Sequence, residues 1–105
     1  MAVPQLDMEI EFEDDELQRL ATDKSFDMAL DRGVVKAFRM AIQAIDAAQD
    51  ERIFAVRPGW RYEKLKGDLR GRCSIRLNKQ WRLLFSLKAN EKKKVVVVIS
   101  IVDYH

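Results

Sequence analysis

The side chains of this sequence that are suited to chemistry lie almost entirely in its second half, and most of them are cationic. Cations stabilise the negative charge that develops on a phosphoryl group during transfer. Asp, Lys and His side chains can move protons, and a Tyr ring can stack on a nucleobase. Together these properties predict phosphate chemistry, and the candidate residues are Lys64, Lys66, Arg72, Arg76, Arg82, Asp103, Tyr104 and His105.

The distribution of charge favours a polyanionic partner. Residues 1–51 carry 13 Asp and Glu against 5 Lys and Arg, a balance of −8, whereas residues 52–105 carry 4 against 14, a balance of +10. A cationic half of this strength is typical of proteins that bind nucleic acid. The alternative is a solvated surface whose two halves attract each other in the fold.

The composition disfavours several other kinds of protein. With one cysteine, Cys73, and one histidine, His105, the chain lacks the ligands of a structural zinc site. The acidic residues between Glu9 and Glu16 are expected to cap and solvate a helix start, so no metal or other cofactor is expected. No apolar run approaches the ~20 residues of a membrane span. The first residues do not resemble a signal peptide, and we expect a cytoplasmic protein.

The hydrophobic pattern changes its period once along the chain, which predicts a single α+β domain over residues 1–105. Alternation over residues 8–12 predicts a short strand, and Asp14 or Asp15 is expected to cap a helix that ends near Ala21. A second helix, of about four turns, is expected to begin after Gly33. Its apolar stripe comprises Val34, Phe38, Ala41, Ile45 and Ala48.

From Arg52 onward the pattern indicates strands. Residues 72–77 and 80–87 alternate apolar and polar side chains, with Cys73 on the apolar side, and a hairpin with the loop 78–80 brings the two apolar sets together. Residues 88–94 are expected to form a basic loop. The apolar run from residue 95 to residue 102 is then an interior strand. The helices are expected to cover one face of a mostly antiparallel, twisted sheet.

The register of this hairpin has a consequence for the arginines. It places Leu77 opposite Trp81 and Arg76 opposite Arg82. Two guanidinium groups side by side on a sheet face repel each other unless an anion lies between them. The alternative is that both side chains point to water and splay apart.

Four segments resemble the HigB branch of the RelE/ParE toxin superfamily. They are Lys64-Leu65-Lys66-Gly67, Ser74-Ile75-Arg76-Leu77-Asn78, Gln80-Trp81-Arg82-Leu83-Leu84-Phe85 and the ending Asp103-Tyr104-His105. They occur in the family's order and at fitting spacing, and the resemblance extends more weakly through the N-terminal half.

The resemblance implies a RelE-like fold and the toxin of a toxin–antitoxin pair, which cleaves mRNA on the 30S ribosomal subunit without a metal ion. The attacking group would be a 2′-OH of the mRNA, and the antitoxin would be a HigA-like helix-turn-helix protein. It implies that Lys66 is the active-site lysine and that Arg82 stabilises the transition state. Asp103, Tyr104 and His105 would transfer protons and position the base. Lys64, Arg72 and Arg76 are expected to contact RNA.

The sequence departs from the family pattern at two places. Cys73 stands where an aromatic residue is usual, and Glu63 or Lys64 stands where some relatives have a histidine. Two rival functions stay open. One is a ParE-like toxin that inhibits a protein such as DNA gyrase without cutting RNA, and the other is an inactive scaffold that only pairs with its antitoxin.

Overall fold

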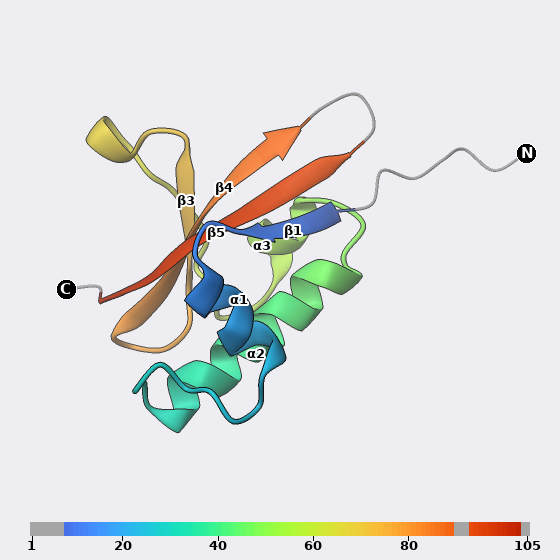
Figure 1. Cartoon of the computed structure of the whole chain (residues 1–105). Helices are drawn as coiled ribbons and strands as arrows, with labels where there is room; N and C mark the ends of the chain where they lie inside the picture. Colours follow the sequence, from blue (N-terminus) through green and yellow to red (C-terminus); the bar gives the residue numbers. More distant parts are fainter. Residues whose placement is uncertain (1–7, 90–92, 104–105) are drawn as a thin grey trace, which may run out of the picture.

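The computed structural model of the chain describes residues 8–89 and 93–103, in which one strand is followed by the α-helices and then by the remaining strands (Figure 1). In chain order they are β1 (Met8–Phe12), α1 (Asp15–Thr22), α2 (Arg32–Ala47), α3 (Arg52–Val56), β2 (Glu63–Lys64), the 3-10 helix η1 (Gly67–Leu69), β3 (Arg72–Arg76), β4 (Trp81–Ala89) and β5 (Lys94–Asp103).

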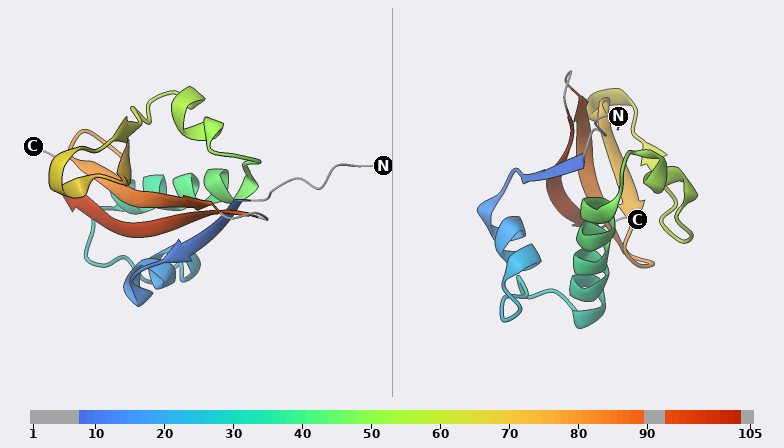
Figure 2. Two further views of the ribbon diagram at one scale, coloured as in Figure 1. Left: turned by 90° about the horizontal axis from the view of Figure 1, so that it is seen from above. Right: turned by 90° about the vertical axis from the view of Figure 1, so that its right-hand side faces the viewer.

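The strands form one sheet in the order β1-β5-β4-β3-β2. β1 runs parallel to β5, and every other neighbouring pair is antiparallel, which confirms the predicted mostly antiparallel sheet. β5 is paired on both sides, as its unbroken apolar run predicted. The views in Figures 1 and 2 show the sheet strongly twisted, with α1 and α2 lying side by side against it.

Helices α1 and α2 cover the face of the sheet that carries the core. Asp14 caps α1 as predicted, because its carboxylate accepts a hydrogen bond from the backbone N–H of Glu16 at 2.7 Å. α2 begins at Arg32, so Gly33 lies inside its first turn and not before it. The core cluster includes Phe38 and Ile45 of α2.

One segment differs from the prediction. The residues after Arg52 were expected to be β, but Arg52–Val56 form a third helix, α3. The Asp50 carboxylate accepts from the backbone N–H of Arg52 at 2.9 Å, which starts the turn. The ring of Phe54 is fully buried and stacks on Phe85 at 4.7 Å between centroids. Tertiary packing of this ring outweighs the weak local pattern of a five-residue segment.

The hairpin formed by β3 and β4 has the predicted register. Arg76 lies opposite Arg82, and the backbone N–H of Leu77 donates to the carbonyl oxygen of Trp81 at 2.9 Å. Cys73 is buried in the core, also as predicted.

The pairing of β4 with β5 contains a bulge that the sequence did not indicate. Leu84 pairs with Ser100 and Phe85 with Val98, so Ile99 is the extra residue of β5. Because side chains alternate along a strand, the extra residue exchanges the faces of everything that follows it. Within residues 8–89 and 93–103, no helix combines the length and apolar character needed to cross a bilayer.

Candidate active site

The alternation of β3 and β4 separates their side chains into an apolar and a polar face. Ile75 and Leu83 lie opposite each other and belong to the core cluster. The residues on either side of them in the sequence, Ser74, Arg76 and Arg82, therefore point to the other face of the sheet. The strands thus place two arginines side by side, away from the helices.

A cationic hollow of about 370 Å³ opens at these arginines. The hairpin and the segment before β2 supply its walls. The lining residues are Arg61, Glu63, Arg76, Asn78, Lys79 and Arg82. Four of these six are cations and one is a carboxylate, so the hollow is positively charged overall and suits an anion.

Arg82 is the most constrained cation of the cationic hollow. It is only 5% exposed. Its Nε donates to the Ser74 hydroxyl at 2.9 Å, and its Nη2 donates to the carbonyl oxygens of Arg61 at 2.6 Å and Ser74 at 3.3 Å. These neutral oxygens fix the plane of the guanidinium. Because few waters screen it, the Arg82 charge acts more strongly on an anion in the hollow than an exposed cation would.

Arg61 contributes both a side chain and a carbonyl oxygen to this arrangement. Its φ of 45° lies in the left-handed region, which costs a residue with a Cβ on the order of 1 kcal/mol. The next residue, Tyr62, packs against the core, and its hydroxyl lies 3.3 Å from Cys73 Sγ. Burial, followed by this hydrogen bond, raises the pKa of Tyr62 above its usual value. The partly buried Tyr62 ring packs against the core and anchors the chain between Arg61 and Glu63, two residues of the wall of the hollow.

Arg76 and the hairpin loop complete the rim. The Arg76 Nε donates to the carbonyl oxygen of Asn78 at 3.0 Å. The Asn78 side chain accepts from the backbone N–H groups of Gln80 and Trp81, both at 2.8 Å, which fixes the loop in a tight turn. This turn holds Lys79 at the edge of the hollow.

The C-terminal end of β5 lies beside the same hairpin. Asp103 pairs with Trp81, and its Oδ2 accepts from Gln80 Nε2 at 3.1 Å. Val102 pairs with Arg82 and lies on the face of the cationic hollow, whereas Asp103 pairs with Trp81 and therefore emerges on the helix-bearing face, outside the residues that line the hollow. Tyr104 and His105 lie outside the described residues, and their predicted roles stay predictions.

The other predicted residues lie away from the cationic hollow. Arg72 is exposed at the far end of β3, on the same face as Arg76. Lys66 immediately precedes η1 at that end, where the N–H of Leu65 donates to the carbonyl oxygen of Arg72 at 2.9 Å. Lys64 pairs with Cys73, whose side chain enters the core, so Lys64 extends from the opposite side of the sheet.

Four residues that line the cationic hollow were not predicted as site residues from the sequence, namely Arg61, Glu63, Asn78 and Lys79. Asn78 and Lys79 could have been predicted, because a tight hairpin loop lies next to the arginines at the ends of its own two strands. Little in the sequence indicated Glu63, because its edge strand β2 has only the two residues Glu63 and Lys64. Nothing in the sequence indicated the left-handed conformation of Arg61. Among the described residues, no three His, Cys, Asp or Glu side chains are grouped to hold a metal ion.

A family model described as the RelE-like toxin HigB of type II toxin–antitoxin systems matches residues 10–105. The chain belongs to the HigB-like toxin family. This HigB-like chain is 38% identical over 78 residues to Toxin HigB-1 of Vibrio cholerae serotype O1. The matched residues cover 74% of this chain and 82% of that protein.

Solved structures share the fold of this HigB-like toxin. A chain of the heterotetrameric YoeB–YefM toxin–antitoxin complex from Staphylococcus aureus matches with a TM-score of 0.58 and 26% identity, covering 93% of this chain and 97% of that one. A YoeB/ParE toxin from Agrobacterium tumefaciens matches with a TM-score of 0.55 and 19% identity, covering 93% and 100%. The predicted RelE-like α+β fold is therefore confirmed.

Proposed function

We propose that this HigB-like toxin is an endoribonuclease that cleaves mRNA on the ribosome. The observation that carries the proposal is the cationic hollow, in which Arg82 is buried and rigidly oriented beside Arg76. A phosphodiester is the anion that this hollow suits, because preoriented cations stabilise the extra charge of a phosphorane-like transition state without reorganising.

In the proposed reaction the 2′-oxygen of the nucleotide before the scissile bond attacks the adjacent phosphorus. The P–O5′ bond breaks, which leaves a 2′,3′-cyclic phosphate and a 5′-hydroxyl. One group must accept the 2′-OH proton and another must supply a proton to the leaving 5′-oxygen. Asp103, Tyr104 and His105 are the candidates from the sequence, but the Asp103 side chain emerges on the helix-bearing face of the sheet. Glu63 joins the candidates because its side chain lines the cationic hollow.

The RNA strand is proposed to follow β3. From the cationic hollow at Arg76 it passes Arg72, which lies on the same face of the sheet, and reaches Lys66 at the start of η1. On this path one RNA strand would contact Arg82 near one end of β3 and Lys66 near the other end. No contact of Lys64 is placed on it, because Lys64 extends from the other side of the sheet.

The proposed partners are the 30S subunit with its mRNA and a HigA-like helix-turn-helix antitoxin. The support for an antitoxin is the family description, which names a type II toxin–antitoxin system, and the structural relative from Staphylococcus aureus, which is a toxin–antitoxin complex.

Primer extension on an mRNA in a translating extract tests the activity. The wild-type chain should generate new 5′ ends, and Arg82→Ala should lower their rate of appearance by about 10²-fold or more, the usual effect of removing one charge-stabilising group. Lys66→Ala should lower it too. Lys88→Ala is the matched control, since Lys88 is an exposed cation of β4 outside the cationic hollow.

The same experiment separates the rivals. Growth arrest without new mRNA ends would overturn the proposal and favour inhibition of a protein such as DNA gyrase. Neither arrest nor cleavage by the wild-type chain would favour an inactive scaffold. Full cleavage by Arg82→Ala would show that the cationic hollow is not the site.

A further inference from the structure

A second hollow, of about 520 Å³, lies between α2 and the segment of residues 23–31 that joins α1 to α2. We call it the α2 hollow. It belongs to the helical layer of the protein, whereas the cationic hollow lies on the opposite face of the sheet. The proposed cleavage of RNA makes no use of it.

The α2 hollow collects nearly all the cations of an acidic half-chain. Residues 1–51 hold five Lys and Arg in all. Four of them, Lys24, Arg32, Lys36 and Arg39, line this hollow. The ion pairs among the described residues do not include Lys24, Arg32 or Lys36. One carboxylate, Asp27, also lines the hollow, so its four cations leave a net lining charge of +3 in a region whose balance is −8.

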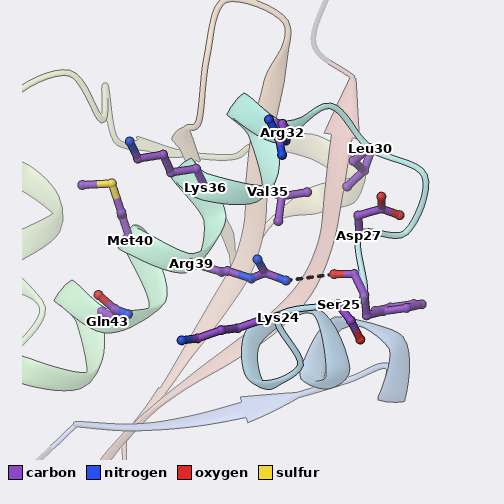
Figure 3. A pocket seen from close by; sticks show the side chains of 11 residues that line it. Lys24, Ser25, Asp27, Leu30, Arg32, Val35, Lys36, Arg39, Met40 and Gln43 are labelled. Carbon is purple, nitrogen blue, oxygen red and sulfur yellow. Dashed lines mark hydrogen bonds between the residues drawn. The ribbon is translucent and has the colours of Figure 1, made fainter.

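Arg39 is preorganised at the centre of the α2 hollow. Its Nε donates to the carbonyl oxygen of Leu20 at 2.9 Å, and its Nη2 donates to those of Asp23 at 2.9 Å and Phe26 at 2.8 Å. Figure 3 shows Lys36 of α2 and Lys24 of the loop extending on either side of this guanidinium. A ligand anion meets a cation whose rotamer is already fixed, so little entropy is lost on binding.

Apolar groups accompany these cations. Phe26 and Leu30 are half-buried in the loop, and Met40 of α2 is 51% exposed at the rim. Figure 3 shows Leu30 and Met40 at opposite ends of the hollow. Methionine adapts to the shape of an apolar partner. The α2 hollow thus offers both charge and apolar surface to one ligand.

We propose that the α2 hollow binds an acidic, amphipathic segment of a partner protein. The inference rests on the proposed function, in which that partner is the antitoxin. Carboxylates alternating with apolar side chains would pair with Lys24, Arg32 and Lys36 and would cover Met40. RNA fits less well, because its many phosphates would extend beyond the hollow and be repelled by the carboxylates of the acidic half-chain. A short peptide segment stays within about a Debye length of the cations that line the hollow.

Fluorescence anisotropy with the full-length chain tests the proposal. The probe is a labelled peptide of about 15 residues, long enough to form a helix, with Leu at every third or fourth position and Glu elsewhere. The wild-type chain should bind this peptide and should not bind its counterpart with Lys in place of Glu. The double variant Arg32→Glu, Lys36→Glu should raise the Kd at least ~10-fold by reversing two attractions. Both residues are exposed, so the fold is retained.

Lys88→Glu is the matched control, because it makes the same change of charge on an exposed site of the sheet. It should leave the Kd unchanged, and Met40→Ser should raise it. Absence of peptide binding by the wild-type chain, or equal binding by the double variant, would overturn the proposal. The proposal would also be overturned if the double variant lost affinity for a single-stranded RNA oligonucleotide but kept its affinity for the peptide.

Cleavage of mRNA separates this inference from the proposed function. The double variant should cleave at the wild-type rate, while Arg82→Ala should lose cleavage and keep its affinity for the peptide. Peptide binding without any cleavage would leave the docking site standing and refute the nuclease.

Discussion

Ser74 holds Arg82 through two hydrogen bonds, one from Nε to the Ser74 hydroxyl at 2.9 Å and one from Nη2 to the Ser74 carbonyl oxygen at 3.3 Å. A residue of β3 therefore sets the plane of a guanidinium that belongs to β4. Replacing Ser74 with alanine removes the hydroxyl bond and leaves the backbone bond, so the contribution of orientation to catalysis can be separated from that of the charge itself.

Ser74→Ala should slow mRNA cleavage without abolishing it. A hydrogen bond to a charged group is worth about 1.5–3 kcal/mol, and each 1.4 kcal/mol is tenfold in rate, so we expect a ten- to hundredfold lower single-turnover rate. The KM should change much less, because the charge of Arg82 remains. Ser86→Ala is the control on the neighbouring strand, where Ser86 pairs with Arg72. Equal effects of the two substitutions would argue against a positioning role for Ser74.

Glu63→Gln should have opposite effects on binding and on cleavage. Removing the carboxylate from the cationic hollow lowers the repulsion of phosphate, so a non-cleavable RNA with 2′-deoxy at the scissile position should bind more tightly. Cleavage of normal RNA should fall by about 10²–10⁴-fold if Glu63 takes the 2′-OH proton. Asp68→Asn, an exposed site on η1, is the matched control. An unchanged cleavage rate in Glu63→Gln would assign proton transfer to the C-terminal residues alone.

Lys79→Ala should weaken RNA binding through the loss of one phosphate contact. For single-stranded nucleic acid, each such contact contributes about 0.7 to the slope of log K against log salt concentration. Titration of an RNA oligonucleotide at several salt concentrations should show this decrease for Lys79→Ala. Lys64→Ala should leave the slope at its wild-type value, because Lys64 lies on the other side of the sheet. A decrease for Lys64 and none for Lys79 would contradict the proposed path of the RNA.

The start of α3 should be sensitive to acid. The side-chain hydrogen bond from Arg52, followed by its backbone N–H, lowers the pKa of Asp50 from 3.8 to about 2. A lowered carboxyl pKa stabilises the folded chain above the unfolded value of 3.8, and this stabilisation is lost as the pH falls through about 2. NMR titration of the Asp50 carboxyl carbon should give a midpoint near 2, and Arg52→Gln should raise it. Because Arg52 is exposed, the thermal midpoint at pH 7 should barely move.

Local pattern was enough to predict the elements that dominate the fold. The apolar stripe of Phe38 and Ile45 predicted α2, and the alternation on both sides of Asn78 predicted the hairpin and its register, with Arg76 opposite Arg82. Both periods are properties of consecutive residues. α3 was not predicted, because five residues carry too little pattern and their helix depends on the packing of Phe54 against Phe85.

The sequence by itself determined the chemistry available to this protein, which is a cationic C-terminal half with two arginines paired across a hairpin, and it determined the family. Only the tertiary structure decided which other groups surround these two arginines. The left-handed turn at Arg61 brings a distant carbonyl oxygen to Arg82, and the extra residue Ile99 sets the face on which Asp103 emerges. Both depend on contacts between segments far apart in the chain, and such contacts leave no local pattern to read.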